Sequence, residues 1–253
     1  MQCGIEVDIE NQTDLIRARA MQERLMLGTQ GGEKDGLDYA AESRPLHRIG
    51  GDCFDCLKLS QDRFCFMVGD ASGKGTAAAL MISSVQTSLR LALSFLGESP
   101  VAAMATANSY FHTVSLPDCY VTVFCGVYDR SLRTLRYVNA GHNPPILLRQ
   151  DNSIEWLDIG GAPVGMFHSW SYAEGTVTLK AGDVFVAYTD GITKASNAAG
   201  EEWGSQGLES TVRRNGGRSA AAIVRSLFDG MNRFADGIQA DDATALVFRA
   251  DGC

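Results

Sequence analysis

Short apolar segments joined by tight turns constrain the fold of this chain more than any other feature. Most neighbouring segments are separated by only a few turn residues, which predicts strands that pair through hairpins. The expected strands are 38–46, 52–59, 63–68, 120–128, 134–139, 145–149, 153–157, 175–179, 184–188 and 243–249. Strands connected this closely run antiparallel, so we predict mainly antiparallel sheets.

Helical patterns occur in two separate blocks. The first contains 76–96, which stops at Gly97, and 98–114, which is entered through Ser99-Pro100. The second contains the expected helices 205–214 and 219–234. Because sheets must bury their apolar faces under other layers, we predict an α+β fold: a four-layer α-β-β-α sandwich of two sheets flanked by helices.

The N-terminal region has a different pattern. Asn11 is a candidate cap for a helix over 11–27, whose apolar positions are Leu15, Ala18, Met21 and Leu25. A Gly-rich linker, 28–36, follows. We therefore expect residues 1–36 to form a helix and linker and residues 37–253 to form one domain. So short a helix must bury its apolar stripe, either on its own domain, on a partner protein or on a second copy.

Charge and composition exclude several classes of protein. The 253 residues include 22 Lys and Arg and 30 Asp and Glu, a net charge of −8 that disfavours nucleic-acid binding. No apolar run reaches the ~20 residues of a membrane span, and no secretory signal is visible. The seven cysteines are irregularly spaced, with one isolated CxxC at Cys53 and Cys56. We expect reduced thiols, no zinc site and a cytoplasmic location.

Acidic residues follow or precede apolar strands at four places. They are Asp52 with Asp55, Asp70, Asp190, and the pair Asp241-Asp242. Carboxylates beside core strands are costly unless they are paired or bind metal, and no comparable set of Lys or Arg stands at the adjacent strand ends. Mg²⁺ or Mn²⁺ is the expected partner. Asp beside Gly is also an ordinary turn residue, so a structural role stays open at this point.

Strand alternation separates two of these acids. Asp52 and Asp55 differ by three positions, so a regular strand points them to opposite faces. We favour Asp52 for a metal site because it follows two glycines. The nearby segment 69–75 resembles a phosphate-binding P-loop but lacks its spacing, so we do not predict nucleotide binding.

Five motifs together resemble those of the metal-dependent serine/threonine phosphatases (PPM, type 2C). They are Gly50-Gly51-Asp52-Cys53-Phe54-Asp55, Gly69-Asp70-Ala71-Ser72-Gly73-Lys74-Gly75, Asn139-Ala140-Gly141-His142-Asn143-Pro144-Pro145, Tyr188-Thr189-Asp190-Gly191-Ile192 and Asp241-Asp242-Ala243-Thr244. The likeness is closer to the bacterial branch of stage II sporulation protein E and the sigma-factor regulators. It implies an α-β-β-α sandwich with a two-metal centre at one end, holding Mn²⁺ or Mg²⁺.

The resemblance also implies roles for individual residues. Asp70 would bridge both metals, and the backbone carbonyl of Ala71 would bind one of them. Asp52 would hold one metal and Asp190 the other. Asp241 is favoured over Asp242 as a further ligand. Asp70 and Asp190 are the acids on which catalysis would most depend, through a metal-activated water that attacks a phosphoserine or phosphothreonine.

Two further motif residues have open roles. Lys74 either attracts the phosphate or is a solvated lysine of the first helical turn. His142 either protonates the leaving group or, as we favour, orders its turn by hydrogen bonds.

The branch implies a substrate and a mode of regulation. Its usual substrate is a phosphorylated anti-sigma-factor antagonist in a partner-switching pathway, and a helix like 11–27 links the catalytic domain to sensor or receiver modules or to a second copy. Two alternatives remain at this stage. One is a non-catalytic phosphoprotein-binding or scaffold protein of the same fold, and the other is a metal-dependent hydrolase of small phosphoesters.

Overall fold

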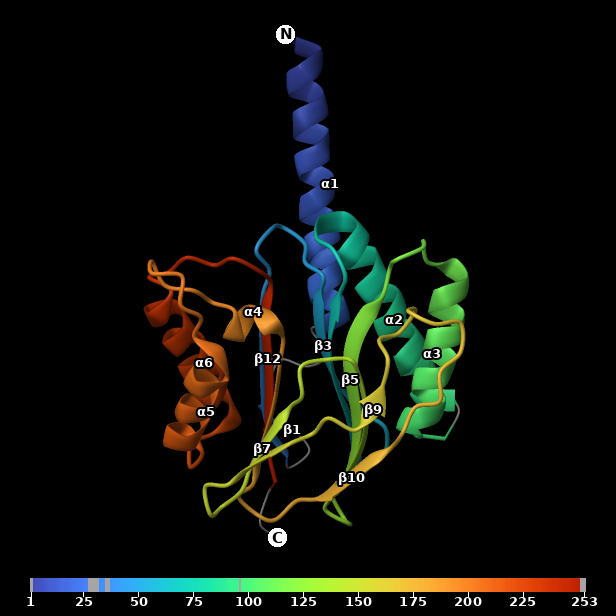
Figure 1. Cartoon of the computed structure of the whole chain (residues 1–253). Helices are drawn as coiled ribbons and strands as arrows, with labels where there is room; N and C mark the ends of the chain where they lie inside the picture. The colour runs from blue at the N-terminus through green and yellow to red at the C-terminus, as the bar shows by residue number, and fades with distance from the viewer. Residues whose placement is uncertain (1, 27–31, 35–36, 96, 251–253) are drawn as a thin grey trace.

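Two six-stranded sheets pack face to face with helices on both outer faces (Figure 1). The computed structural model describes residues 2–26, 32–34, 37–95 and 97–250, without the side chains of 2–11 and 32–34. Sheet A has the order β1-β2-β12-β11-β7-β8, and sheet B has the order β10-β6-β5-β4-β3, with β9 beside β6. All the pairings are antiparallel except that of β6 with β9. The predicted four-layer sandwich is confirmed.

The strands match most of the sequence expectations to within a few residues. In sheet A they are β1 Gly32–Lys34, β2 Leu37–Arg44, β7 Ile146–Leu148, β8 Ile154–Trp156, β11 Val184–Tyr188 and β12 Ala243–Arg249. In sheet B they are β3 Asp52–Lys58, β4 Arg63–Ala71, β5 Val121–Asp129, β6 Thr134–Ala140, β9 Gly160–Gly161 and β10 Gly175–Thr178. The short strands β1 and β9 were not expected.

The core between the sheets is rich in aromatic side chains. Phe66 of β4 stacks on Phe248 of β12 with ring centroids 4.3 Å apart, and Phe185 of β11 stacks on Phe248 at 4.8 Å. Alternate residues of β4, such as Cys65 and Met67, face the helices instead. Both faces of this strand are therefore buried, which explains its unbroken apolar sequence.

The helices cover the outer faces as two pairs. α2 (Gly75–Phe95) and α3 (Pro100–Val114) pack on sheet B, while α5 (Gly204–Asn215) and α6 (Ala220–Phe234) pack on sheet A. The one-turn helix α4 (Asp190–Thr193) follows β11. By length and composition alone α2 could cross a membrane, but a core helix passes the same test, and α2 buries Ile82, Val85 and Leu89 within the domain.

Short connections do not always form hairpins here, because β2 and β3, β6 and β7, and β10 and β11 are joined by a few residues but lie in different sheets. The segments on either side of Lys180–Asp183 become β10 and β11, and these lie in different sheets. β10 pairs with β6, whereas β11 pairs with β12 and β7. A four-residue connection can either close a hairpin or carry the chain from one sheet to the other. Which of the two forms depends on the strands with which each segment pairs.

The N-terminal helix is longer than expected and stands largely outside the sandwich (Figure 1). α1 runs over Gln2–Met26, so Asn11 is an interior residue and not a cap. No proline interrupts residues 2–10, and one Asn inside a helix has only a small cost, so the helix continues past it. The expected linker also needs correction, because Gly32–Lys34 form β1 on the edge of sheet A. The rest of that linker, apart from residues 32–34, lies outside the described residues.

Candidate metal centre

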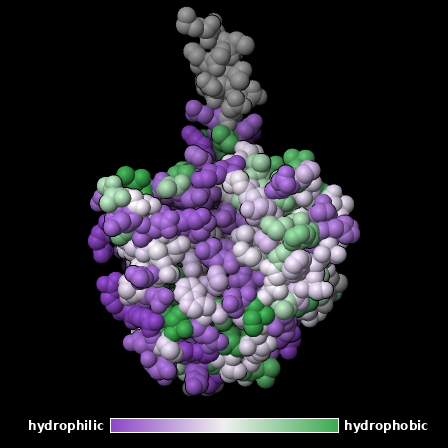
Figure 2. Space-filling view, viewed as in Figure 1, coloured by the Kyte–Doolittle hydropathy of each residue, from purple (hydrophilic) through white to green (hydrophobic). Residues whose placement is uncertain are grey.

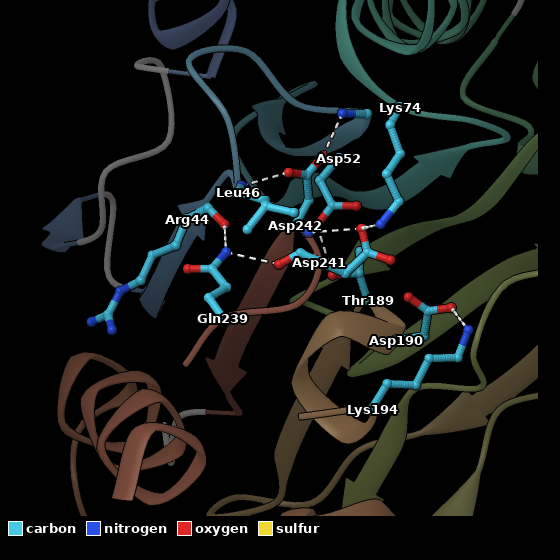
Figure 3. Close-up of polar contacts among 11 residues, drawn as sticks. Arg44, Leu46, Asp52, Lys74, Thr189, Asp190, Lys194, Gln239, Asp241 and Asp242 are labelled. Atoms are coloured by element: carbon cyan, nitrogen blue, oxygen red, sulfur yellow. Dashed lines mark hydrogen bonds and ion pairs between the residues drawn. The ribbon is translucent and has the colours of Figure 1, made fainter. Parts of the chain in front are cut away.

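The topology brings the predicted acids to one end of the sandwich. Asp52 opens β3 and lies directly opposite Asp70 of β4, so both side chains point to the same face of sheet B. Asp190 follows β11, and Asp241-Asp242 precede its neighbour β12 in sheet A. We call Asp52, Asp70, Asp190, Asp241 and Asp242 the candidate metal centre; Figure 3 shows all of them except Asp70 as labelled side chains.

A cleft of about 350 Å³ opens at this end. Its lining residues are Asp70, Ala71, Ser72, Gly73, Lys74, Tyr120, Thr122, Gly141, Asn143, Asp190, Asp241 and Asp242. Four of the five predicted motifs contribute to this lining, although they are spread over more than 170 residues of the chain.

Asp52 joins the two sheets from a buried position. It is 3% exposed, and one carboxylate oxygen accepts hydrogen bonds of 2.7 Å from the hydroxyls of both Thr189 and Thr244. Burial, followed by the neighbouring charge of Asp70, raises the pKa of Asp52 well above its usual value. The two hydroxyls do not neutralise this carboxylate, so the site favours a cation or a proton.

Asp70 experiences the strongest crowding of negative charge. Burial, then the carboxylates of Asp190 and Asp241, raise its pKa to about 7. The hydroxyl of Thr122, on the neighbouring strand, donates to the Asp70 carbonyl at 3.3 Å. A divalent cation would relieve this repulsion.

Asp241 and Asp242 make different contacts despite being adjacent. The Asp242 carboxylate accepts two 2.7 Å hydrogen bonds from the backbone N–H groups of Leu46 and Gly51, and so fixes the loop that leads into β3. A Cβ on Gly50 would lie 2.7 Å from this carboxylate, which explains the glycine there. The Asp241 carboxylate instead forms an ion pair with Lys74 at the cleft, and it accepts a backbone hydrogen bond from the N–H of Asp242. Asp241, the favoured ligand of the two, is therefore less firmly held by backbone donors than Asp242.

Two lysines contradict the expectation that these acids lack cationic partners. Lys74 Nζ lies 3.1 Å from Asp241, and Lys194 Nζ lies 2.6 Å from Asp190 (Figure 3). Lys74 stands in the loop before α2, and Lys194 directly follows α4. Neither lysine stands at a strand end, and Lys194 lies one helical turn after Asp190.

The chemistry of the centre fits divalent metal ions. Carboxylate oxygens are the ligands that Mg²⁺ and Mn²⁺ prefer, and burial together with neighbouring carboxylates raises the pKa of Asp52 and of Asp70. Among the described residues no three Asp, Glu, His or Cys side chains converge on one point as they stand. Two of the carboxylates, those of Asp190 and Asp241, contact lysines instead.

Asp55 lies away from this centre, as alternation predicts. It is fully buried beneath α2, where the Arg90 guanidinium binds both of its oxygens, one of them at 2.6 Å. Gln86 of the same helix also donates to it at 3.4 Å. Asp55 is therefore the partner of an arginine and not a residue of the cleft.

His142 lies behind the cleft wall. It is 4% exposed, its backbone N–H donates to Asn139 Oδ1, and its Nδ1 lies 3.0 Å from the Thr122 hydroxyl. Burial lowers its pKa to about 4, so the imidazole is neutral near pH 7. The bond to Asn139 lies within the turn, and the contact with Thr122 ties the turn to β5. Ala71 lies in the cleft wall, with its N–H bonded to the Gly51 carbonyl at 3.0 Å.

Comparison with known families assigns the chain. The family model described as Stage II sporulation protein E (SpoIIE) matches residues 60–251. The chain belongs to the SpoIIE family. This is a family of PP2C-like serine phosphatase domains, to which RsbU and RsbP are homologous.

Individual relatives of this SpoIIE-family chain are distant. Phosphoserine phosphatase RsbU of Bacillus subtilis is 25% identical over 97% of this chain and 72% of RsbU. Protein IcfG of Synechocystis is 26% identical over 94% of this chain, which spans 41% of IcfG. Among solved structures, the SiaA-PP2C domain of Pseudomonas aeruginosa has a TM-score of 0.85 at 20% identity, covering 97% of this chain and 99% of that domain. The catalytic domain of the phosphatase PstP in complex with two manganese ions has a TM-score of 0.63 at 16% identity, covering 85% and 99%.

The sequence did not predict three residues that contact the acids of this SpoIIE-family site. Thr189 and Thr244 stand inside the quoted motifs, but their hydroxyls gain a role only when Asp52 arrives from the other sheet. The contact of Lys194 with Asp190 could have been predicted, since a spacing of four residues places the two on one face of a helix.

Proposed function

We propose that this chain is a metal-dependent protein serine/threonine phosphatase. The observation that carries the proposal is the pairing of Asp52 and Asp70 directly opposite each other on β3 and β4, at the same end as Asp190 and Asp241. Opposed carboxylates at strand positions that face one another are destabilising without a cation. Membership of a serine phosphatase family supports the same interpretation.

The residues of the centre have different roles in this proposal. Asp70, Asp52, Asp190 and Asp241, with the Ala71 carbonyl, would hold two Mn²⁺ or Mg²⁺ ions. When bound, such ions activate a water for in-line attack on phosphorus and neutralise the phosphoryl oxygens. The Thr189 and Thr244 hydroxyls hold Asp52 in place, and Asp242 fixes the loop before it.

The test is phosphatase activity as a function of metal. EDTA should abolish hydrolysis of a phosphoserine protein and of p-nitrophenyl phosphate, and Mn²⁺ should restore both. Full activity in a verified metal-free sample would overturn the proposal. Hydrolysis of p-nitrophenyl phosphate alone would favour a small-phosphoester hydrolase, and no hydrolysis of either would favour a non-catalytic scaffold.

The finer proposal is that the substrate is a phosphorylated anti-sigma-factor antagonist in the cytoplasm. The likeness to RsbU supports this, and the described cysteines are free thiols, as a reducing compartment requires. A pull-down with the Asp190→Asn variant should retain the phosphorylated partner. Recovery of equal amounts by the parent and the variant would contradict trapping at this site.

We further propose that α1 mediates self-association or contact with a sensor or receiver module. Gln22 exchanges two hydrogen bonds with the backbone of Gly50, at 2.7 and 3.1 Å, so polar groups anchor the helix beside the loop that precedes Asp52. Two residues of the apolar stripe remain exposed, Met21 at 70% and Leu25 at 37%, while Leu15 and Ala18 are half-buried. Replacing Leu15 and Leu25 together by Asp should change the oligomeric state by light scattering, or the specific activity at saturating Mn²⁺. A folded double variant that matches the parent in both would refute this role.

A further inference from the structure

We infer that Lys74 and Lys194 act as exchangeable counter-ions of the candidate metal centre: they occupy its carboxylates when metal is absent and bind the phosphoryl oxygens of the substrate when metal is present. This inference rests on the proposed function and extends it to two residues with a defined ligand, a phosphate group.

The first argument is position. The two ammonium groups approach the centre from different parts of the fold, Lys74 from the loop after β4 of sheet B and Lys194 from the end of α4 beside sheet A (Figure 3). Each pairs with a different acid, Asp241 or Asp190. Lys74 lines the cleft together with Asp70, Asp190 and Asp241, and Lys194 is linked to the cleft through its contact with Asp190.

The second argument is mobility. The side chains of Lys74 and Lys194 are 55% and 58% exposed. The glycines on either side of Lys74, Gly73 and Gly75, both have positive φ and no heavy atom within 4 Å of an added Cβ, so the loop leaves open space around this lysine. Exposed lysine–carboxylate pairs are weak, so a dication can displace them. Hydrophilic residues are frequent in the middle of the molecular face between the two helix layers (Figure 2).

The third argument is charge balance. The five ionised carboxylates of the centre carry five negative charges, and two dications would supply four positive charges. Without the lysines the loaded centre would have a net charge of −1 and would repel a phosphate dianion. The two ammonium groups change this charge to +1, and each offers three N–H donors suited to phosphate oxygens.

Removing either lysine charge should change the affinity for Mn²⁺ and the affinity for inorganic phosphate in opposite directions. Lys74→Gln and Lys194→Gln should each tighten Mn²⁺ binding to metal-free protein by about threefold, because the competing ammonium is gone. Each should weaken the binding of inorganic phosphate to the Mn²⁺-loaded protein by a similar factor, and the double variant should show larger changes in both. Both constants come from calorimetric titration of the full chain.

Two controls make the result specific. Lys180→Gln removes the same charge from the turn between β10 and β11, away from the cleft, and should leave both constants within about twofold of the parent. Replacing Lys74 and Lys194 together by Arg keeps both charges and should return both constants toward the parent values. The inference is overturned if the Gln variants match the parent, or if their two constants change in the same direction. Failure of parent and variants alike to bind Mn²⁺ would instead overturn the proposed function, and this inference with it.

Discussion

Asp52 and Asp55 lie three residues apart on β3, both almost inaccessible to solvent, yet their surroundings differ in kind. Asp55 faces α2 and meets a guanidinium on both oxygens. Asp52 faces the other side, where it meets two neutral hydroxyls and lies opposite a second carboxylate. One negative charge is balanced within the chain and the other is not.

The difference shows how a buried acid indicates its role. A carboxylate that has a complete set of charged partners stabilises the fold, and removing it leaves the partner unpaired. A carboxylate that is hydrogen-bonded but not neutralised has a raised pKa, as Asp52 does, and is suited to a ligand that arrives from outside. Substitutions can separate these two cases.

The largest expected effect is on catalysis at the unbalanced acid. Asp52→Asn, like Asp70→Asn and Asp190→Asn, should lower kcat by on the order of a hundredfold or more, the scale of losing a key electrostatic group. In the Asp52→Asn variant the amide oxygen of the new side chain can still accept from Thr189 and Thr244, so the free energy of unfolding of the metal-free protein should stay equal or rise. Steady-state kinetics and urea unfolding measure the two. A loss of stability with activity intact would reverse the assignment of the two faces.

A smaller effect, on stability, is expected at the balanced acid. Asp55→Asn should lower the free energy of unfolding by about 2 kcal/mol, less than for a fully buried pair because the Arg90 side chain is 33% exposed. Its kcat at saturating Mn²⁺ should change by only a few-fold. If Asp55→Asn reduces kcat as much as Asp52→Asn does, the comparison between the two acids fails.

The smallest expected effect is the pH dependence of metal-free stability. The folded-state pKa of Asp70 is raised to about 7, so the folded chain binds a proton that the unfolded chain has already released. Stability should therefore fall as pH rises from about 5 to about 8. Thermal unfolding in EDTA should show Tm decreasing by a few degrees over this range, and Asp70→Asn should flatten the decrease. A Tm that rises over the same interval would contradict the crowding at Asp70.

Much of the fold could be predicted because its signals are local. The strand 243–249 and the cap-and-proline entry to α3 agree with the structure at or near residue level, since a short apolar run, Ser99 and Pro100 are signals that act over a few residues. The start of α1 was predicted incorrectly, and the separation of β10 and β11 into different sheets was not predicted. The first depends on whether a helix extends toward the N-terminus beyond a candidate cap, and the second on which distant strands offer hydrogen bonds.

The candidate site divides in the same way. The acids of the cleft were found because each is tied to a strand end and a motif, and the separation of Asp55 followed from alternation alone. The partners were harder to find: Arg90 for Asp55, the two threonines for Asp52, and Lys74 for Asp241 each come from another element.

By itself, the sequence determined the types of element, the two layers of helices and the acids that end the strands, because these follow from the period of apolar residues and from local turn chemistry. Only the tertiary structure decided which acids are balanced. Adjacent residues such as Asp241 and Asp242 have the same chemistry but meet different partners, a lysine at the cleft and two backbone N–H groups of the loop before β3. Whether the negative charge of a carboxylate is neutralised depends on the groups that folding brings within about 3 Å of it. At that distance the electrostatic interaction with the nearest group in space is stronger than that with residues that are near only in sequence.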